Sequence, residues 1–91
     1  MANHQIPRIA ERIEELTCVT SEGRAARCRV YRHTRAGHSL PDFYVIQYLL
    51  TERGGVDRST RVTSQITGAH AQARLDAEMT EVRALFAAAG K

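Results

Sequence analysis

The feature that most constrains the fold of this chain is a two-residue alternation over residues 26–35, ARCRVYRHTR, which only Arg32 interrupts. Successive side chains of a β-strand point to opposite faces of a sheet. One face would therefore carry Arg27, Arg29, Tyr31, His33 and Arg35, and the other Ala26, Cys28, Val30, Arg32 and Thr34. The pattern predicts a strand of an antiparallel sheet with its small, apolar face on a core and its cationic face in solvent.

A hairpin is predicted around this strand. Residues 17–20 are β-forming, and the residues SEG at 21–23 provide a turn. With a three-residue loop centred on Gly23, Cys18 lies opposite Cys28. Two interpretations stay open for this pair: a cross-strand disulfide, or two buried and reduced thiols, which a reducing compartment favours.

Within residues 42–53 the apolar side chains fall on both faces, with aromatic and β-branched residues first: Phe43, Tyr44, Val45, Ile46, Tyr48, Leu49 and Leu50. That composition favours a central strand, although Asp42 and the Gly54–Gly55 pair also suit the two ends of a helix. We predict a strand here and a further strand near residues 58–66, where Val62, Ser64 and Ile66 alternate with Arg61, Thr63 and Gln65. If 42–53 were helical, the chain would suit a helix-turn-helix DNA-binding protein.

Two amphipathic helices complete the expected fold. Ile6, Ile9, Ile13 and Leu16 recur at helical spacing near the N-terminus, as do Leu75, Met79, Val82, Phe86 and Ala89 near the C-terminus. We expect one α+β domain over residues 1–91, with a three- to four-stranded antiparallel sheet and both helices on one face. The order would be α-β-β-β-β-α or α-β-β-β-α.

The C-terminal pattern also has the spacing of a coiled coil. Leu75, Met79, Val82 and Phe86 are therefore a candidate seam for a homodimer. A chain of 91 residues buries a limited area by itself, and pairing would add to it.

The positive charge of the chain is concentrated in its middle third. Residues 24–63 carry eight arginines against three acidic residues, whereas residues 1–23 sum to −2 and residues 64–91 to zero. Such asymmetry indicates an anionic partner, because guanidinium groups match phosphate oxygens and aromatic rings stack on bases. The candidate nucleic-acid or anion-binding residues are Arg24, Arg27, Arg29, Tyr31, His33, Arg35, Arg58 and Arg61.

The function expected from these residues is that of a small non-enzymatic binding protein that contacts DNA or RNA mainly through phosphates, with little sequence specificity. The alternative is a protein-interaction module, an accessory or inhibitor protein that docks an acidic partner through the same face. A third interpretation needs no ligand: cross-strand acids such as Asp57 would neutralise a face that is merely solvated.

Signatures of other classes are missing from the sequence. It has no glycine-rich nucleotide motif. Cys28, His33 and His38 are each five residues apart, which is unlike the closely spaced ligand pairs of zinc sites. We expect no enzymatic activity, no cofactor and no metal. Since there is no apolar run of signal-peptide or membrane-span length, we expect a cytoplasmic protein with no membrane partner.

Overall fold

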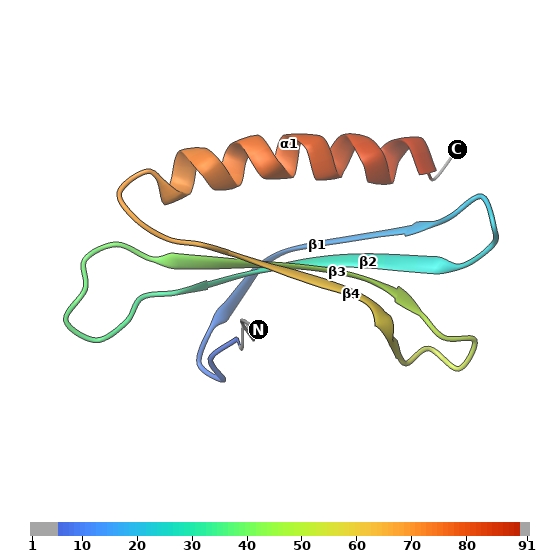
Figure 1. Cartoon of the computed structure of the whole chain (residues 1–91), viewed down its shortest axis with the longest axis horizontal. Coiled ribbons are helices and arrows are strands. Elements are labelled where there is room, and N and C mark those ends of the chain that lie inside the picture. Colours follow the sequence, from blue (N-terminus) through green and yellow to red (C-terminus); the bar gives the residue numbers. More distant parts are fainter. Residues whose placement is uncertain (1–5, 90–91) are drawn as a thin grey trace.

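The computed structural model describes residues 6–89, which form a four-stranded antiparallel sheet and one helix (Figure 1). Strands β1 (Glu11–Val19), β2 (Ala25–His33), β3 (Asp42–Leu50) and β4 (Val56–Ile66) lie side by side in chain order, and helix α1 (Ala71–Ala89) follows them. The α+β class, the antiparallel sheet and the C-terminal helix predicted from the sequence are confirmed.

The predicted N-terminal helix is wrong. Glu11–Val19 form β1, and the residues before it make a turn in which Ala10 N–H donates to the carbonyl oxygen of Pro7 at 3.0 Å. The isoleucines of the expected apolar stripe do not share a core, since Ile9 is 81 % exposed and Ile13 is 38 % exposed. The order is therefore β-β-β-β-α.

Pairing with β2 explains why this segment is extended. β1 supplies the second neighbour that β2 needs for its backbone hydrogen bonds, and its carboxylates lie next to arginines of β2. Glu11 accepts a hydrogen bond from Arg32 at 2.9 Å, and Glu15 accepts one from Arg29. A register shift between Arg12 and Glu14 interrupts the ladder. Such non-local pairing outweighs the local helical spacing.

Residues 42–50 form β3, as predicted, so the condition for a helix-turn-helix is not met. The predicted alternation of β4 is also confirmed. Ser64 and Ile66 pair with Val45 and Phe43 on one face of the sheet, and Thr63 and Gln65 pair with Ile46 and Tyr44 on the other.

The β1–β2 and β3–β4 loops have the same pattern of backbone hydrogen bonds. In each, a threonine N–H donates at 2.7 Å to the carbonyl oxygen four residues later, and the glycine between them donates at 2.9 Å to the threonine carbonyl. The threonines are Thr20 and Thr51, and the glycines, Gly23 (φ 83°) and Gly54 (φ 86°), adopt the left-handed conformation that glycine accepts without strain.

This loop geometry corrects the predicted cysteine pairing. The β1–β2 loop ends at Gly23 and is not centred on it, so the register moves by two residues. Cys18 pairs with Ala26, and Cys28 pairs with Leu16. Both cysteines are free thiols.

One face of the sheet, which we call the inner face, packs against α1. The core between them consists of Cys28, Val30, Phe43, Val45, Ile66, Ala71, Leu75, Met79 and Val82, with Leu16 and Phe86 at its border. Because Leu75, Met79 and Val82 are at most 4 % exposed, the predicted dimer seam is covered by the sheet of the same chain. These side chains are not available to a second copy in this arrangement.

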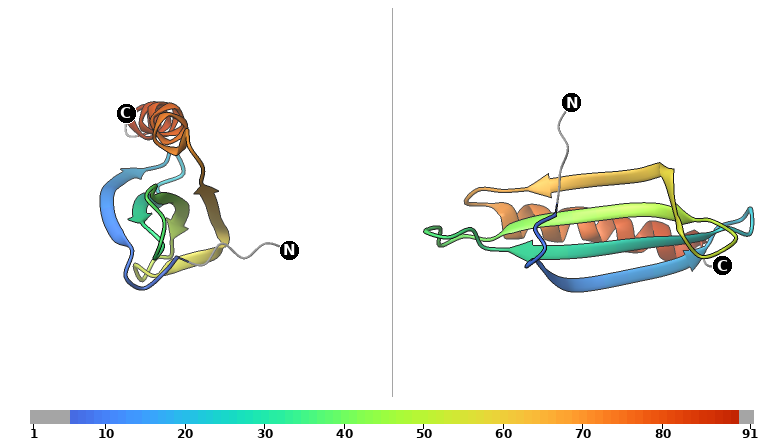
Figure 2. Two further views of the ribbon diagram at one scale, coloured as in Figure 1. Left: turned by 90° about the vertical axis from the view of Figure 1, so that its left-hand side faces the viewer. Right: turned by 90° about the horizontal axis from the view of Figure 1, so that it is seen from below.

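The sheet is strongly twisted, and its edge strands cross it diagonally (Figure 1). The first residues of β4 turn away from α1 at one end of the sheet, and the first residues of β1 do so at the other end (Figure 1). Viewed end-on, α1 covers the inner face alone (Figure 2). We call the opposite side the open face.

Candidate functional site

The open face carries most of the predicted site residues. Ala26, Cys28 and Val30 of β2 are buried toward α1, so Arg27, Arg29, Tyr31 and His33 project to the other side, as the alternation predicted. Their partners across the ladder on β3 are Tyr48, Ile46, Tyr44 and Asp42. A central pair of strands therefore places two arginines, a tyrosine and a histidine beside a row that is largely aromatic and apolar.

A large bulge in β4, with four residues opposite one, brings Arg58 and Arg61 to this face. The β3–β4 register shifts between Gln47 and Leu49, where residues 58–61 lie opposite Tyr48 alone. Within the bulge, the hydroxyl of Thr60 accepts a hydrogen bond from Leu49 N–H at 2.8 Å and donates to the carbonyl oxygen of Asp57 at 2.8 Å. A side chain thus replaces a backbone partner of the ladder. Bulges of this kind redirect side chains and bend the strand.

Asp57 stabilises the start of the bulge. Its Oδ1 accepts hydrogen bonds from Ser59 N–H at 3.1 Å and from the Ser59 hydroxyl at 2.6 Å. Its Oδ2 accepts a 2.7 Å bond from Arg24. The bonds from Ser59, and then that from Arg24, lower the pKa of Asp57. The carboxylate therefore stays charged at neutral pH and fixes the backbone conformation that presents Arg58 and Arg61.

The bulge and the centre of the sheet together form a hollow of about 260 Å³ on the open face. Ile46 and Tyr48, each 7 % exposed, lie deepest among its lining residues. The remaining lining residues are Arg29, Tyr31, Val56, Arg58 and Arg61. Three guanidinium groups and the Tyr31 phenol thus surround a base formed by Ile46 and Tyr48, and none of the described lining residues is acidic.

Glu15 of β1 is the acid nearest to this site through its bond to Arg29. That bond lowers the pKa of Glu15 and is the main reason why the pKa of Arg29 is raised. Tyr31 and Tyr48 line the hollow together with Arg29, and both phenol groups also contribute to raising the Arg29 pKa. Arg12 also lies 3.5 Å from Glu15. Arg29 is consequently shared between Glu15 and the hollow.

Arg27 of β2 has a buried side-chain nitrogen, Nε, that forms no hydrogen bond within residues 6–89. Its neighbours across the ladder are Thr17 of β1 and Tyr48 of β3. Arg27 forms no ion pair within residues 6–89, although its charge contributes to lowering the pKa of Glu15.

Three other predicted residues are not part of the hollow. Arg24 is held by Asp57 and by the carbonyl oxygen of Leu50, at 2.7 and 3.1 Å. The Nε of Arg35 lies 3.1 Å from Oδ2 of Asp42, a carboxylate that is only 3 % exposed, so Arg35 balances a buried charge. His33 lies at the far end of the open face, opposite Asp42 in the ladder.

The apolar base of the site, Ile46 and Tyr48, was not among the site residues predicted from the sequence. The available signal was the alternation of Phe43 and Val45 with Tyr44, Ile46 and Tyr48. With both sets apolar, the pattern did not reveal which set faces the helix and which faces the arginines. That distinction depends on the β2–β3 register. The eight-residue connection between these strands, residues 34–41, is too long for its sequence to determine the register.

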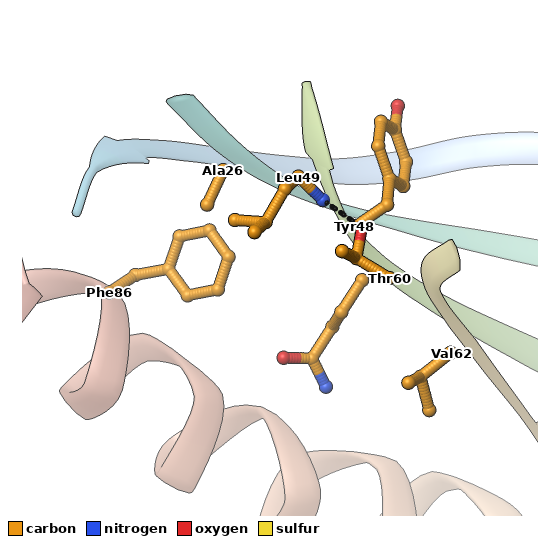
Figure 3. A pocket seen from close by; sticks show the side chains of 7 residues that line it. Ala26, Tyr48, Leu49, Thr60, Val62 and Phe86 are labelled. Carbon is orange, nitrogen blue, oxygen red and sulfur yellow. Dashed lines mark hydrogen bonds between the residues drawn. The ribbon is translucent and has the colours of Figure 1, made fainter. Parts of the chain in front are cut away.

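A second hollow, of about 290 Å³, lies on the inner face (Figure 3). It forms where β4 bends away from α1, and Leu49, Val62 and Phe86 contribute to its lining. Figure 3 shows the Tyr48 ring projecting to the opposite side of the sheet from Phe86. The described residues that line this inner hollow are uncharged, in contrast to the three arginines that line the hollow on the open face.

The described residues include no group of three or more histidine, cysteine, aspartate or glutamate side chains that could hold a metal ion. No helix within residues 6–89 has the length and apolar character needed to cross a membrane. Comparisons of the chain with protein-family models, with curated proteins and with solved structures find no match. The function must therefore be argued from the chemistry of the open face.

Proposed function

We propose that this protein is a small non-enzymatic binding protein whose open face contacts nucleic acid mainly through phosphate groups. The observation that carries the proposal is the hollow in which Arg29, Arg58 and Arg61 meet Tyr31 and Tyr48. Guanidinium groups bind phosphate oxygens in pairs of hydrogen bonds. Phenol rings offer flat surfaces on which bases stack. A site with this combination suits a ligand that is both anionic and aromatic.

The two arginines of the bulge are suited to the phosphate contacts. Arg58 and Arg61 are exposed, and neither forms an ion pair with another residue in the range 6–89. A phosphate that approaches them has no acidic side chain to displace. Binding would release counterions from the nucleic acid, and affinity would fall as the salt concentration rises.

Little sequence specificity is expected. Base sequence is read mainly by side chains that enter a groove, often from an exposed helix. Among residues 6–89 the only helix is α1, which packs its apolar side on the sheet and exposes acidic residues such as Asp76 and Glu81. Contacts from the sheet to the phosphate backbone would carry most of the affinity.

The proposal is tested by fluorescence anisotropy of labelled single- and double-stranded DNA and RNA, at low and at physiological salt. We expect micromolar or tighter binding at low salt that weakens steeply as salt is added. Absence of binding to every probe at low salt would overturn the proposal. A polyglutamate competitor added at matched charge separates the alternative, because a face built for an acidic protein would prefer the polypeptide.

A pair of double variants locates the contact. Arg58→Ala/Arg61→Ala removes two charges from the bulge, and we expect the slope of log K against log salt to shrink by roughly two units. The matched control, Arg53→Ala/Arg74→Ala, removes two exposed charges from the β3–β4 loop and from α1. Equal losses in both variants would mean that only net charge matters, which would contradict a site on the open face.

A further inference from the structure

We infer that the hollow on the open face accepts one unpaired nucleotide, so that the protein prefers single strands to duplexes. This inference rests on the proposed function and narrows its substrate class. It follows from three properties of the hollow: what lies at its base, what surrounds it, and what shape the bent strand gives it.

The base of the hollow is apolar and aromatic. Ile46 and Tyr48 are each 7 % exposed, and Val56, which is 45 % exposed, adds an apolar side wall. A phosphate group brings no apolar surface to cover these side chains. An unstacked base does, because each base has a flat face that stacks on aromatic rings. The composition of the base therefore favours a nucleobase over a phosphate as the group that enters.

Charged groups surround this apolar base. Arg29 comes from β2, whereas Arg58 and Arg61 come from the bulge of β4, so guanidinium groups reach the hollow from two separate strands. The phosphates on the two sides of an inserted nucleotide would meet these arginines. Tyr31, which is half-buried on β2 beside Arg29, is placed to contact the base itself.

The size and shape of the hollow favour a single nucleotide-sized group over a larger ligand. The volume of about 260 Å³ is below the roughly 300–1,000 Å³ of small-molecule sites and suits a single group. The first residues of β4 turn away from α1 toward the open side of the sheet and flank the hollow (Figures 1 and 2). In a duplex the bases are stacked inside and must be extruded at a cost in free energy, whereas an unpaired strand offers them directly.

A surface that binds phosphate alone would behave differently. Double-stranded DNA has the higher charge density, with a salt slope of roughly 0.9 per neutralised phosphate compared with roughly 0.7 for single strands. Such a surface would hold a duplex at least as tightly as a single strand of equal length. The order of the two affinities therefore separates a base-accepting hollow from a merely cationic face.

The experiment compares three labelled probes of equal length at one salt concentration: a single strand, its duplex, and a single strand in which abasic sites replace the bases. We expect the duplex and the abasic strand to bind roughly 5- to 150-fold more weakly than the intact single strand, the range for losing one stacked base. Equal or tighter binding of the duplex, or unchanged binding of the abasic strand, would overturn the inference and leave the proposed function intact. Failure of all three probes would remove both.

Variants of Tyr31 give an independent test. Tyr31→Leu removes the ring, and we expect it to weaken single-strand binding within the same range without changing the salt slope. Tyr31→Phe keeps the ring and should bind like the unmodified protein. Circular dichroism confirms that both variants are folded. A weaker Tyr31→Phe variant, or a Tyr31→Leu variant of undiminished affinity, would count against base stacking at this residue.

Discussion

Arg83 of α1 and Glu14 of β1 form a two-bonded ion pair, with nitrogen–oxygen distances of 2.7 and 2.8 Å. The two residues are 69 positions apart in the chain, and their contact joins the helix to an edge strand of the sheet. The bond from Arg83 lowers the pKa of Glu14 from its ordinary value. This contact is the first target for a stability experiment.

A lowered carboxyl pKa fixes the sign of the pH dependence. The Glu14 contribution to folding is complete above its unfolded pKa, near 4.5, and disappears as the pH falls through the lower folded value. We therefore expect Glu14→Gln to lower the melting temperature at pH 7 and to match the unmodified protein more closely near pH 3. Thermal unfolding followed by circular dichroism at both pH values provides the measurement. A difference of the same size at both pH values would show that the charge of Glu14 is not responsible.

Thr60 is expected to stabilise the bulge through its hydroxyl. Thr60→Val keeps the shape but leaves the N–H of Leu49 without its acceptor, at a cost of about 1 kcal/mol for a half-buried donor. The variant should also bind nucleic acid less tightly, because the bulge presents Arg58 and Arg61. Thr60→Ser keeps the hydroxyl and serves as control. Urea unfolding and anisotropy would contradict this role if Thr60→Val and Thr60→Ser behaved alike.

Glu15 is expected to limit the affinity of the open face. A glutamate carboxylate is ionised at neutral pH, the bond from Arg29 lowers the pKa of Glu15 further, and this carboxylate occupies part of the Arg29 guanidinium. Glu15→Gln should therefore strengthen nucleic-acid binding and steepen the salt slope by roughly 0.7, the value for one more phosphate contact on a single strand. Glu22→Gln, an equal charge change in the exposed β1–β2 loop, is the control for net charge. An equal gain in both variants would place the effect outside this site.

Cys28 should be inert in the folded protein. It is fully buried, and desolvation raises the pKa of its thiol to about 11. At pH 8 only about one Cys28 thiol in a thousand is ionised, and the thiolate is the reactive form. Iodoacetamide labelling followed by mass spectrometry should modify the half-buried Cys18 first, and both cysteines once the protein is unfolded in urea. Early modification of Cys28 would reveal an opening of the core that the packing does not suggest.

The sequence correctly predicted those elements in which the spacing of apolar residues matches the side that is buried in the fold. β2 alternates because it has α1 on one side and solvent on the other, and α1 keeps its seam because Leu75, Met79 and Val82 face one sheet. β1 was missed because Ile6, Ile9, Ile13 and Leu16 have helical spacing by themselves. What makes the segment extended is a partner strand, and periodicity within the segment contains no information about that partner.

The candidate site shows the same limit. Charge and residue type singled out Arg29, Tyr31, Arg58 and Arg61, which the hollow brings together. They did not separate these residues from Arg24, which is held by Asp57 across the sheet. Ion pairs of this kind depend on register, and register depends on loop geometry such as the glycine position in the β1–β2 loop.

The strand order β1-β2-β3-β4 has a consequence for synthesis on the ribosome. Each strand finds its partner in the segment made just before it, so the sheet can assemble hairpin by hairpin with little loop entropy to overcome. The apolar inner face, with Val30, Phe43 and Val45, nevertheless stays uncovered until α1 has emerged. Nascent chains that stall before residue 71 would expose this surface to chaperones or to one another. Helix α1, made after the four strands, is therefore the element that closes the core.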